Sequence, residues 1–191
     1  AQISGLRGVM VPISSENMVS GQLNGSLMTV HSMGLELYCR FTSDQIGAIS
    51  SDDLWNQLQR VQHKLPLARI VLPALPQSFA QMTRSARYGW KWQMEGVKSL
   101  SQAAQALEAG CAGIWIQVGA LDGAHELDGD ELCSQVRNLV DSHAGAPTQP
   151  LVVATDIRDL DHVERSLQYG CDRTVVTQQI WQQLNLNALA S

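Results

Sequence analysis

Short apolar segments alternate with longer amphipathic segments along most of the chain. The apolar segments are rich in β-branched residues, have the length of strands, and fall at 6–13, 35–41, 68–75, 90–96, 113–118, 151–155 and 173–177. Because most of them are apolar at consecutive positions, they are typical of parallel strands covered by helices rather than of strands with one solvated face. The pattern therefore predicts seven parallel strands.

Helices are predicted for four of the intervening segments, at 51–65, 99–110, 130–141 and 159–169. Two of these helices end at a glycine, Gly110 and Gly170, which is the residue expected just past a helix C-terminus. In both places a Gly-Cys turn leads into an apolar strand, and repeated units of this kind imply right-handed parallel crossovers. The sequence thus predicts an α/β fold with 1–191 as a single domain, and an open sheet and a barrel both fit it.

Composition and charge narrow the class of protein further. The chain has 191 residues, a formal net charge of −5 and no basic run, which argues against nucleic acid and anionic membranes as partners. No stretch of about 18 apolar residues is present, so no membrane-spanning helix is predicted. The four cysteines, Cys39, Cys111, Cys133 and Cys171, form no CxxC pair. We expect buried free thiols and a cytoplasmic protein.

No metal site or cofactor is predicted. The five histidines share none of the spacings HxH, HxxxH or HExxH. No glycine-rich phosphate loop follows the first strand, which weakens the interpretation as a nucleotide-binding sheet.

Several segments resemble, in order, the strands of small transaldolases and fructose-6-phosphate aldolases. LRGVMVPIS is similar to the family's LAGVTTNPS, and ARIVLPALP to its strand IVVKVP. PLVVATDIR, with the helix and Gly-Cys turn after it, is similar to the units around ASSIR. The resemblance covers nearly the whole chain and implies an eight-stranded TIM (β/α)8-type barrel whose first strand would precede Ala1. Three alternatives would explain why that strand is not in this sequence: the chain is trimmed, it is a shortened homologue, or it is part of a longer protein.

The resemblance also implies a Schiff-base lysine on a strand, and this chain lacks it. The position falls on Pro73, or on Leu72 or Ala74 if the register shifts by one, and none of these can form an imine. Among the chain's three lysines, only Lys91 is expected on a strand, where it shares a face with Glu95. Lys91 and Glu95 are therefore the candidates for a relocated catalytic site.

Other positions that the resemblance marks as functional are also altered. The third-strand Gln falls on Arg40 and the sixth-strand Tyr on Gln117. The phosphate-binding motif reads Asp156-Ile157-Arg158, so that its Arg is kept while Asp156 replaces the Ser. A carboxylate there is expected to repel a phosphate dianion by roughly one to a few kcal/mol. Arg40, Gln117, Asp156 and Arg158 are the candidate ligand-binding residues.

Two hypotheses on function follow. The first is a transaldolase-like barrel that has lost Schiff-base catalysis and acts as a binding or scaffold domain (a pseudoenzyme), with a protein partner or self-association. The alternative is a sugar-phosphate aldolase or transaldolase, a carbon–carbon lyase or transferase of carbohydrate metabolism, with a rebuilt site for a small anionic or sugar-like ligand. The polar candidates would lie near the barrel mouth in both cases, where they would either plug the barrel or perform acid–base chemistry.

Overall fold

The computed structural model describes residues 6–13, 29–30, 32–85, 88–118, 128–143 and 149–190, with the backbone alone for 185–190. The chain divides into two compact units, 2–94 and 95–191, here called the N-terminal unit and the C-terminal unit. Their formal charges have opposite signs. The N-terminal unit has eight Lys and Arg against five Asp and Glu (+3), and the C-terminal unit has five against thirteen (−8). The expectation of a single domain stays a prediction.

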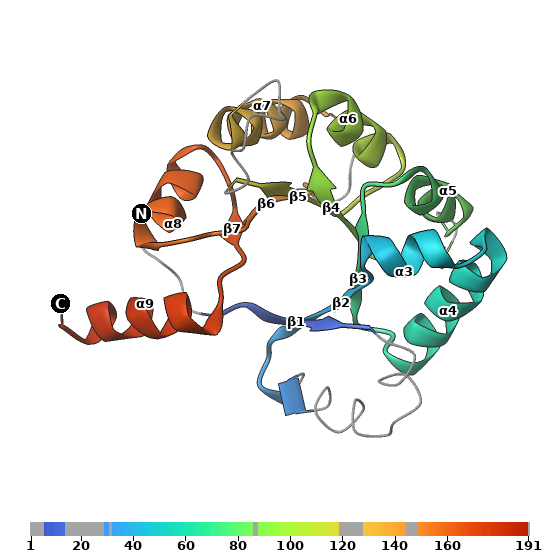
Figure 1. The fold of residues 1–191 in the computed structure, drawn as a ribbon, viewed down its shortest axis with the longest axis horizontal. Coiled ribbons are helices and arrows are strands. Elements are labelled where there is room, and N and C mark those ends of the chain that lie inside the picture. The colour runs from blue at the N-terminus through green and yellow to red at the C-terminus, as the bar shows by residue number, and fades with distance from the viewer. Residues whose placement is uncertain are drawn as a thin grey trace. The chain divides into compact units, whose positions relative to one another are not determined.

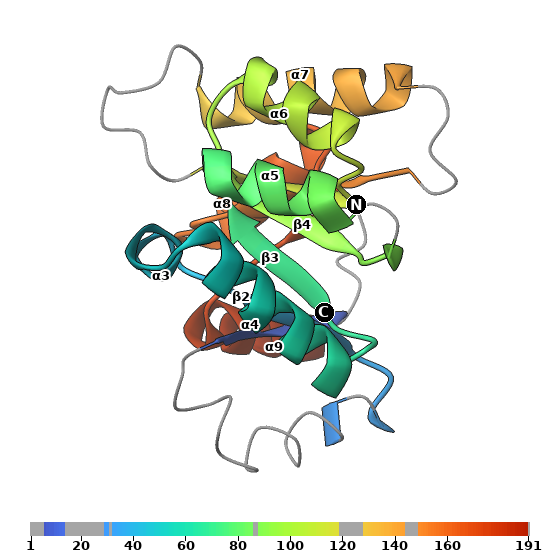
Figure 2. The ribbon, with the colours of Figure 1, turned by 90° about the vertical axis from the view of Figure 1, so that its right-hand side faces the viewer.

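The N-terminal unit is built from parallel strands connected by helices. Its strands are β1 (Gly8–Pro12), β2 (Glu36–Arg40) and β3 (Arg69–Pro73), which pair in chain order. Its helices are α3 (Ser43–Ala48), α4 (Ser51–Lys64) and α5 (Pro76–Ser85). Figures 1 and 2 show α4 and α5 along one side of β2 and β3. β4 (Trp92–Val97) begins in this unit, and the Ile70 N–H donates to the Lys91 carbonyl just before it, at 3.1 Å.

The strand register of the N-terminal unit separates a polar face from an apolar one. Tyr38 is level with Arg69, and Arg40 with Val71, so these side chains share one face. The other face carries Cys39, Ile70 and Leu72, all fully buried, and this apolar face is what the helices need to cover.

The C-terminal unit repeats the same strand–helix pattern. Its strands β5 (Gly113–Gln117), β6 (Leu151–Thr155) and β7 (Arg173–Thr174) are parallel and pair in chain order. Its helices are α6 (Leu100–Glu108), α7 (Gly129–Ser142), α8 (Leu160–Gln168) and α9 (Gln178–Ala190). Ile114, Ile116, Val152 and Ala154 are fully buried and share one face of β5 and β6. Figure 1 shows α6 and α7 along one side of these two strands.

Most elements agree with the sequence pattern. All seven predicted strands are present and the paired ones are parallel, all four predicted helices are present within two residues at each end, and the four cysteines are buried free thiols. Two differences stand out: β7 is only two residues long, and the strand expected at 90–96 begins at Trp92. The apolar pattern did not predict α3, α5 or α9. α3 has only six residues and is defined by the capping box of Thr42 and Gln45 rather than by apolar periodicity. Among the described helices, none is long and apolar enough to cross a membrane.

Candidate functional site

The position at which the resemblance implies a lysine lies at the carboxyl end of β3 and carries no amine. Pro73 ends β3, is buried, and lies on the same face as Arg40, which ends β2. Leu72 points to the opposite, apolar face and is fully buried. Arg40 lies on the same face of the neighbouring strand, level with Val71, and a guanidinium does not replace the amine that a Schiff base needs.

The structure corrects the placement of Lys91. This residue precedes β4 instead of lying on a strand, and its side chain is exposed. It stands at the amino end of the strands, whereas TIM-barrel active sites stand at the carboxyl end. Lys64 and Lys98 are also exposed, so every lysine of the chain is on the surface. None of the three side chains lies in the desolvated surroundings in which a Schiff-base lysine is held.

In the C-terminal unit, the carboxyl ends of β5 and β6 bring polar groups together. Gln117 is level with Thr155, so the two side chains share a face; Gln117 is exposed and Thr155 is buried. The Thr155 hydroxyl donates to the Ile116 carbonyl at 3.3 Å, and the Val118 N–H donates to the Thr155 carbonyl at 3.1 Å. Glu95 lies on β4 in the same unit and is half-buried.

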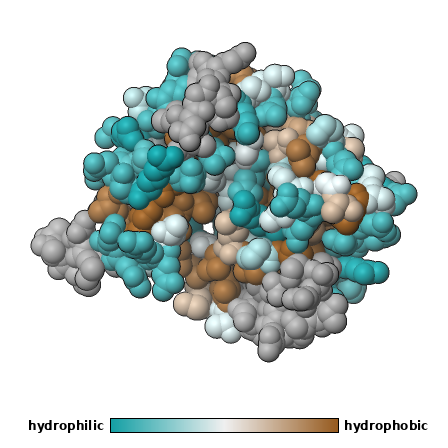
Figure 3. Space-filling model, viewed as in Figure 1, coloured by the Kyte–Doolittle hydropathy of each residue, from teal (hydrophilic) through white to brown (hydrophobic). Residues whose placement is uncertain are grey.

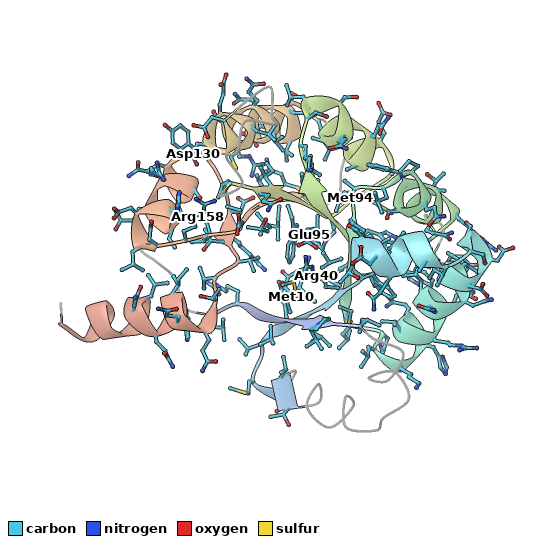
Figure 4. The ribbon with its side chains drawn as sticks, viewed as in Figure 1. Met10, Arg40, Met94, Glu95, Asp130 and Arg158 are labelled. Atoms are coloured by element: carbon cyan, nitrogen blue, oxygen red, sulfur yellow. The ribbon has the colours of Figure 1, made fainter. Side chains whose placement is uncertain are left out.

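Asp156 turns the chain directly after β6. Its φ is 59°, and among the described residues it is the non-glycine residue with a left-handed backbone. Asp tolerates this conformation better than most residues, at a cost on the order of 1 kcal/mol. The turn leads through buried Ile157 to exposed Arg158 and to Asp159, whose carboxylate accepts the His162 N–H at 2.8 Å and caps α8. Figure 4 shows Arg158 at this point and Asp130 at the start of α7.

Carboxylates dominate this end of the C-terminal unit. We call it the acidic edge, defined by the first turns of α7 and α8 and the turn after β6: Asp128, Asp130, Glu131, Asp156, Asp159 and Asp161. Hydrophilic residues gather over α8 on the face shown in Figure 3. Acidic residues suit helix N-termini because they complement the macrodipole, so the five at the starts of α7 and α8 have a structural reason to be there. Together they make this edge unfavourable for a phosphate dianion.

The start of α7 is held against β5 by Gly129. A Cβ on this residue would lie 2.8 Å from the Val118 Cα and 3.1 Å from the Val118 carbonyl oxygen. Because these are backbone atoms, they cannot rotate away. We expect Gly129→Ala to lower the free energy of unfolding by about 1–3 kcal/mol, measured by urea denaturation.

Gly47→Ala is the matched control for that measurement. Gly47 lies in α3 with nothing within 4 Å of an added Cβ. There the substitution is expected to stabilise the protein by about 0.5–1 kcal/mol through helix propensity and reduced unfolded-state entropy. Equal effects of the two substitutions would show that α7 does not pack this closely on β5.

In the N-terminal unit, a polar cluster lies at the amino ends of β2 and β3. The Tyr38 hydroxyl donates to Glu36 Oε2 at 2.5 Å, and Arg69 Nη2 donates to Glu36 Oε1 at 2.6 Å. The Arg69 guanidinium also lies 5.9 Å from the centre of the Tyr38 ring. This cluster could not be predicted from the sequence, because its members meet only through the parallel register of β2 and β3. Each group is paired, so the cluster is typical of a structural network.

The predicted residues thus divide between the two units. Gln117, Asp156 and Arg158 lie at one edge of the C-terminal unit, while Arg40 and Lys91 lie at opposite ends of strands in the N-terminal unit. In the part of the chain that the structure describes, no group of three His, Cys, Asp or Glu residues could hold a metal ion.

No model of a known protein family matches the chain, and no curated protein matches it. Solved structures do match. One is a native KDPGal structure, with a TM-score of 0.62 and 15% identity over 91% of this chain and 70% of that one. Another is mandelate oxidase with (S)-2-phenylpropionate, with a TM-score of 0.58 and 15% identity over 91% of this chain and 57% of that one.

A third is a cube-shaped porous cage designed by fusing symmetric oligomeric domains, with a TM-score of 0.60 and 16% identity over 89% of this chain. The chain spans 53% of the length of the cage protein and 57% of that of mandelate oxidase. At these identities the likeness shows the fold alone, which is an α/β fold like that of TIM-barrel proteins.

Proposed function

We propose that the chain is a transaldolase-like barrel domain that no longer forms a Schiff base and acts as a binding or scaffold domain. The observation that carries this proposal is the carboxyl end of β3, where the resemblance expects a lysine and Pro73 stands. The exposure of all three lysines supports the proposal, because a Schiff-base lysine needs desolvated surroundings and none of the three side chains has them. Closure of the barrel by an eighth strand is part of the proposal.

The acidic edge supports the loss of sugar-phosphate binding. Arg158 matches the cation of the family's phosphate motif, but Asp156, Asp159 and Asp161 flank it in the sequence, and further carboxylates begin α7 in the same unit. An uncharged, sugar-like ligand that donates hydrogen bonds to carboxylates fits this edge better than a phosphate ester. Association with protein partners also fits a scaffold, and one similar structure is a cage made from oligomeric domains.

The second candidate function is an aldolase or transaldolase with a rebuilt site. The strained backbone of Asp156 next to Arg158 favours it, because such conformations cluster at functional sites. In that case a carboxylate and a guanidinium at the end of β6 would hold the substrate, and Lys91 or a non-covalent mechanism would replace the missing lysine.

Borohydride trapping separates these two functions. The protein is incubated with fructose 6-phosphate or dihydroxyacetone, reduced with borohydride, and analysed by intact mass and peptide mapping beside an active Schiff-base aldolase. We expect no site-selective adduct, because no lysine is desolvated. Lys91→Arg and Lys98→Arg are the matched variants, since both lysines are exposed. Equal, weak labelling of the two supports surface chemistry only, whereas an adduct confined to Lys91 and lost in Lys91→Arg would overturn the proposal.

A further inference from the structure

An aromatic cluster in the N-terminal unit reaches the surface at the amino end of β3 and β4. The Trp90 ring stacks on Trp55 of α4 at 5.2 Å between centroids and on Tyr88 at 5.6 Å, and it lies 5.5 Å from Trp92. Trp55 and Trp92 are buried beneath, while Tyr88 is 45% exposed. Leu67, just before β3, is 70% exposed. We call Leu67, Tyr88 and Trp90 the aromatic surface.

The aromatic surface is rigid and has cations around it. Arg84 lies 4.5 Å above the Trp55 ring and pairs with Asp52 at 3.0 Å, which fixes the cluster from the side of α5. Lys91 follows Trp90 directly and is exposed, and Lys64 is exposed in the last turn of α4. The described segments that precede β2, β3 and β4, at 32–35, 65–68 and 88–91, contain no carboxylate. Tyr, Trp and Arg at one rigid patch are the residue types that dominate binding energy in protein interfaces.

The chemistry of the aromatic surface selects an acidic partner, and this chain itself supplies one. The C-terminal unit has a formal charge of −8, and six of its carboxylates form the acidic edge. We propose that the aromatic surface of one copy docks on the acidic edge of a second copy. Because the two surfaces differ, the contact is heterologous, and a dimer joined by one such contact keeps one free aromatic surface and one free acidic edge.

A second copy explains the pattern better than a membrane does. The cluster's two most buried rings, Trp55 and Trp92, are packed inward rather than projecting as membrane-inserting side chains would. In this proposal the partner of the scaffold domain is a second copy of the same chain. The inference rests on the scaffold function proposed above. Sedimentation reports self-association, whereas borohydride trapping reports Schiff-base formation. Either proposal can therefore fail without the other.

Sedimentation velocity over a range of concentrations tests the contact. We expect the wild-type protein to associate at about 50 mM salt and to dissociate toward monomer at about 500 mM, because the charges are screened. Tyr88→Asp is expected to weaken association about tenfold, since it removes an anchor and adds a repelling charge. Tyr169→Asp is the matched control, because Tyr169 is 44% exposed and lies in the C-terminal unit outside the acidic edge. Circular dichroism confirms that both variants are folded.

A mixing experiment tests whether the two surfaces differ. Lys91→Glu reverses the positive charge at the aromatic surface. The double substitution Glu131→Lys/Asp161→Lys reverses two negative charges of the acidic edge. We expect each variant alone to be monomeric and their equimolar mixture to form a dimer, because each keeps the surface that the other lacks. A wild-type protein that stays monomeric at low salt would overturn the proposal. So would a mixture that stays monomeric, or Tyr88-dependent binding to phosphatidylserine vesicles without association.

Discussion

Replacing Trp92 by alanine is expected to lower the free energy of unfolding of the N-terminal unit by about 3–5 kcal/mol. Trp92 is 2% exposed at the start of β4, and it is among the largest fully buried side chains of the described residues. Its removal leaves a cavity that rigid neighbours cannot fill, because Trp90 beside it is already held by its stacking on Trp55 and Tyr88. The cost therefore includes both the lost burial and the cavity.

The measurement is urea unfolding followed by far-UV circular dichroism, because the substitution removes a fluorophore. Leu67→Ala is the control: its side chain is 70% exposed, and its loss is expected to change stability by no more than about 0.5 kcal/mol. Trp92→Phe keeps a ring in the site and should fall between the two. A loss below about 1 kcal/mol for Trp92→Ala would mean that β4 is not packed as the structure has it.

The strands and longer helices could be predicted because each is defined by neighbours in the chain. The run at 68–75 is apolar whatever surrounds it, and β3 falls within it. Trp55 and Trp90 are 35 positions apart, and no periodicity shows that a helix residue and a loop residue will stack at 5.2 Å. The aromatic surface therefore could not be predicted from the sequence. The five tryptophans indicated only that aromatic packing would be extensive.

The residue types of the candidate site came from the resemblance, and its geometry did not. The resemblance led to Pro73, Asp156 and Arg158; the structure puts Pro73 at the last position of β3, and Asp156 and Arg158 in the turn after β6. It did not predict the left-handed backbone of Asp156, because Asp is compatible with several turn conformations. It misplaced Lys91 because the apolar run around Trp90 begins before the strand does, and hydrophobicity alone does not mark the first residue of a strand.

Negative charge gathers at the carboxyl ends of the strands because helices begin there. In each unit the helix N-termini stand at the carboxyl ends of the strands, so capping and first-turn acids such as Asp52, Asp130 and Asp161 collect there. Capping thus supplies negative charge at the end where a sugar-phosphate enzyme needs cations. Arginines and a lysine would have to overcome that charge in such an enzyme, and Arg158 is the cation that the resemblance matches to a phosphate motif. The same charge that disfavours a phosphate makes this end suitable for a basic protein surface.

Alkaline pH is expected to destabilise the protein through Cys39. This residue is fully buried on β2, and burial raises the pKa of its thiol to about 12. In the unfolded chain the thiol has its ordinary pKa, near 8.5–9. Below about pH 8 both states keep the proton, and Cys39 contributes no pH dependence. Above about pH 9 the unfolded chain loses the proton that the folded chain retains, so the free energy of unfolding falls as the pH rises.

Cys39→Ala isolates this effect from the other groups that titrate at high pH. Between about pH 9.5 and 11 the wild-type protein should lose about 1.4 kcal/mol per pH unit more than the variant, approaching about 4 kcal/mol by pH 12. Cys171 adds a loss of the same sign, because its hydrogen bond to Cys133 and its burial raise the pKa of its thiol, but this loss is common to both proteins. Alanine lowers stability at neutral pH by leaving a small cavity, so the slopes are compared rather than the absolute values. Parallel slopes in urea unfolding would show that Cys39 ionises in the folded state as easily as in water, and that β2 is not buried on its apolar face.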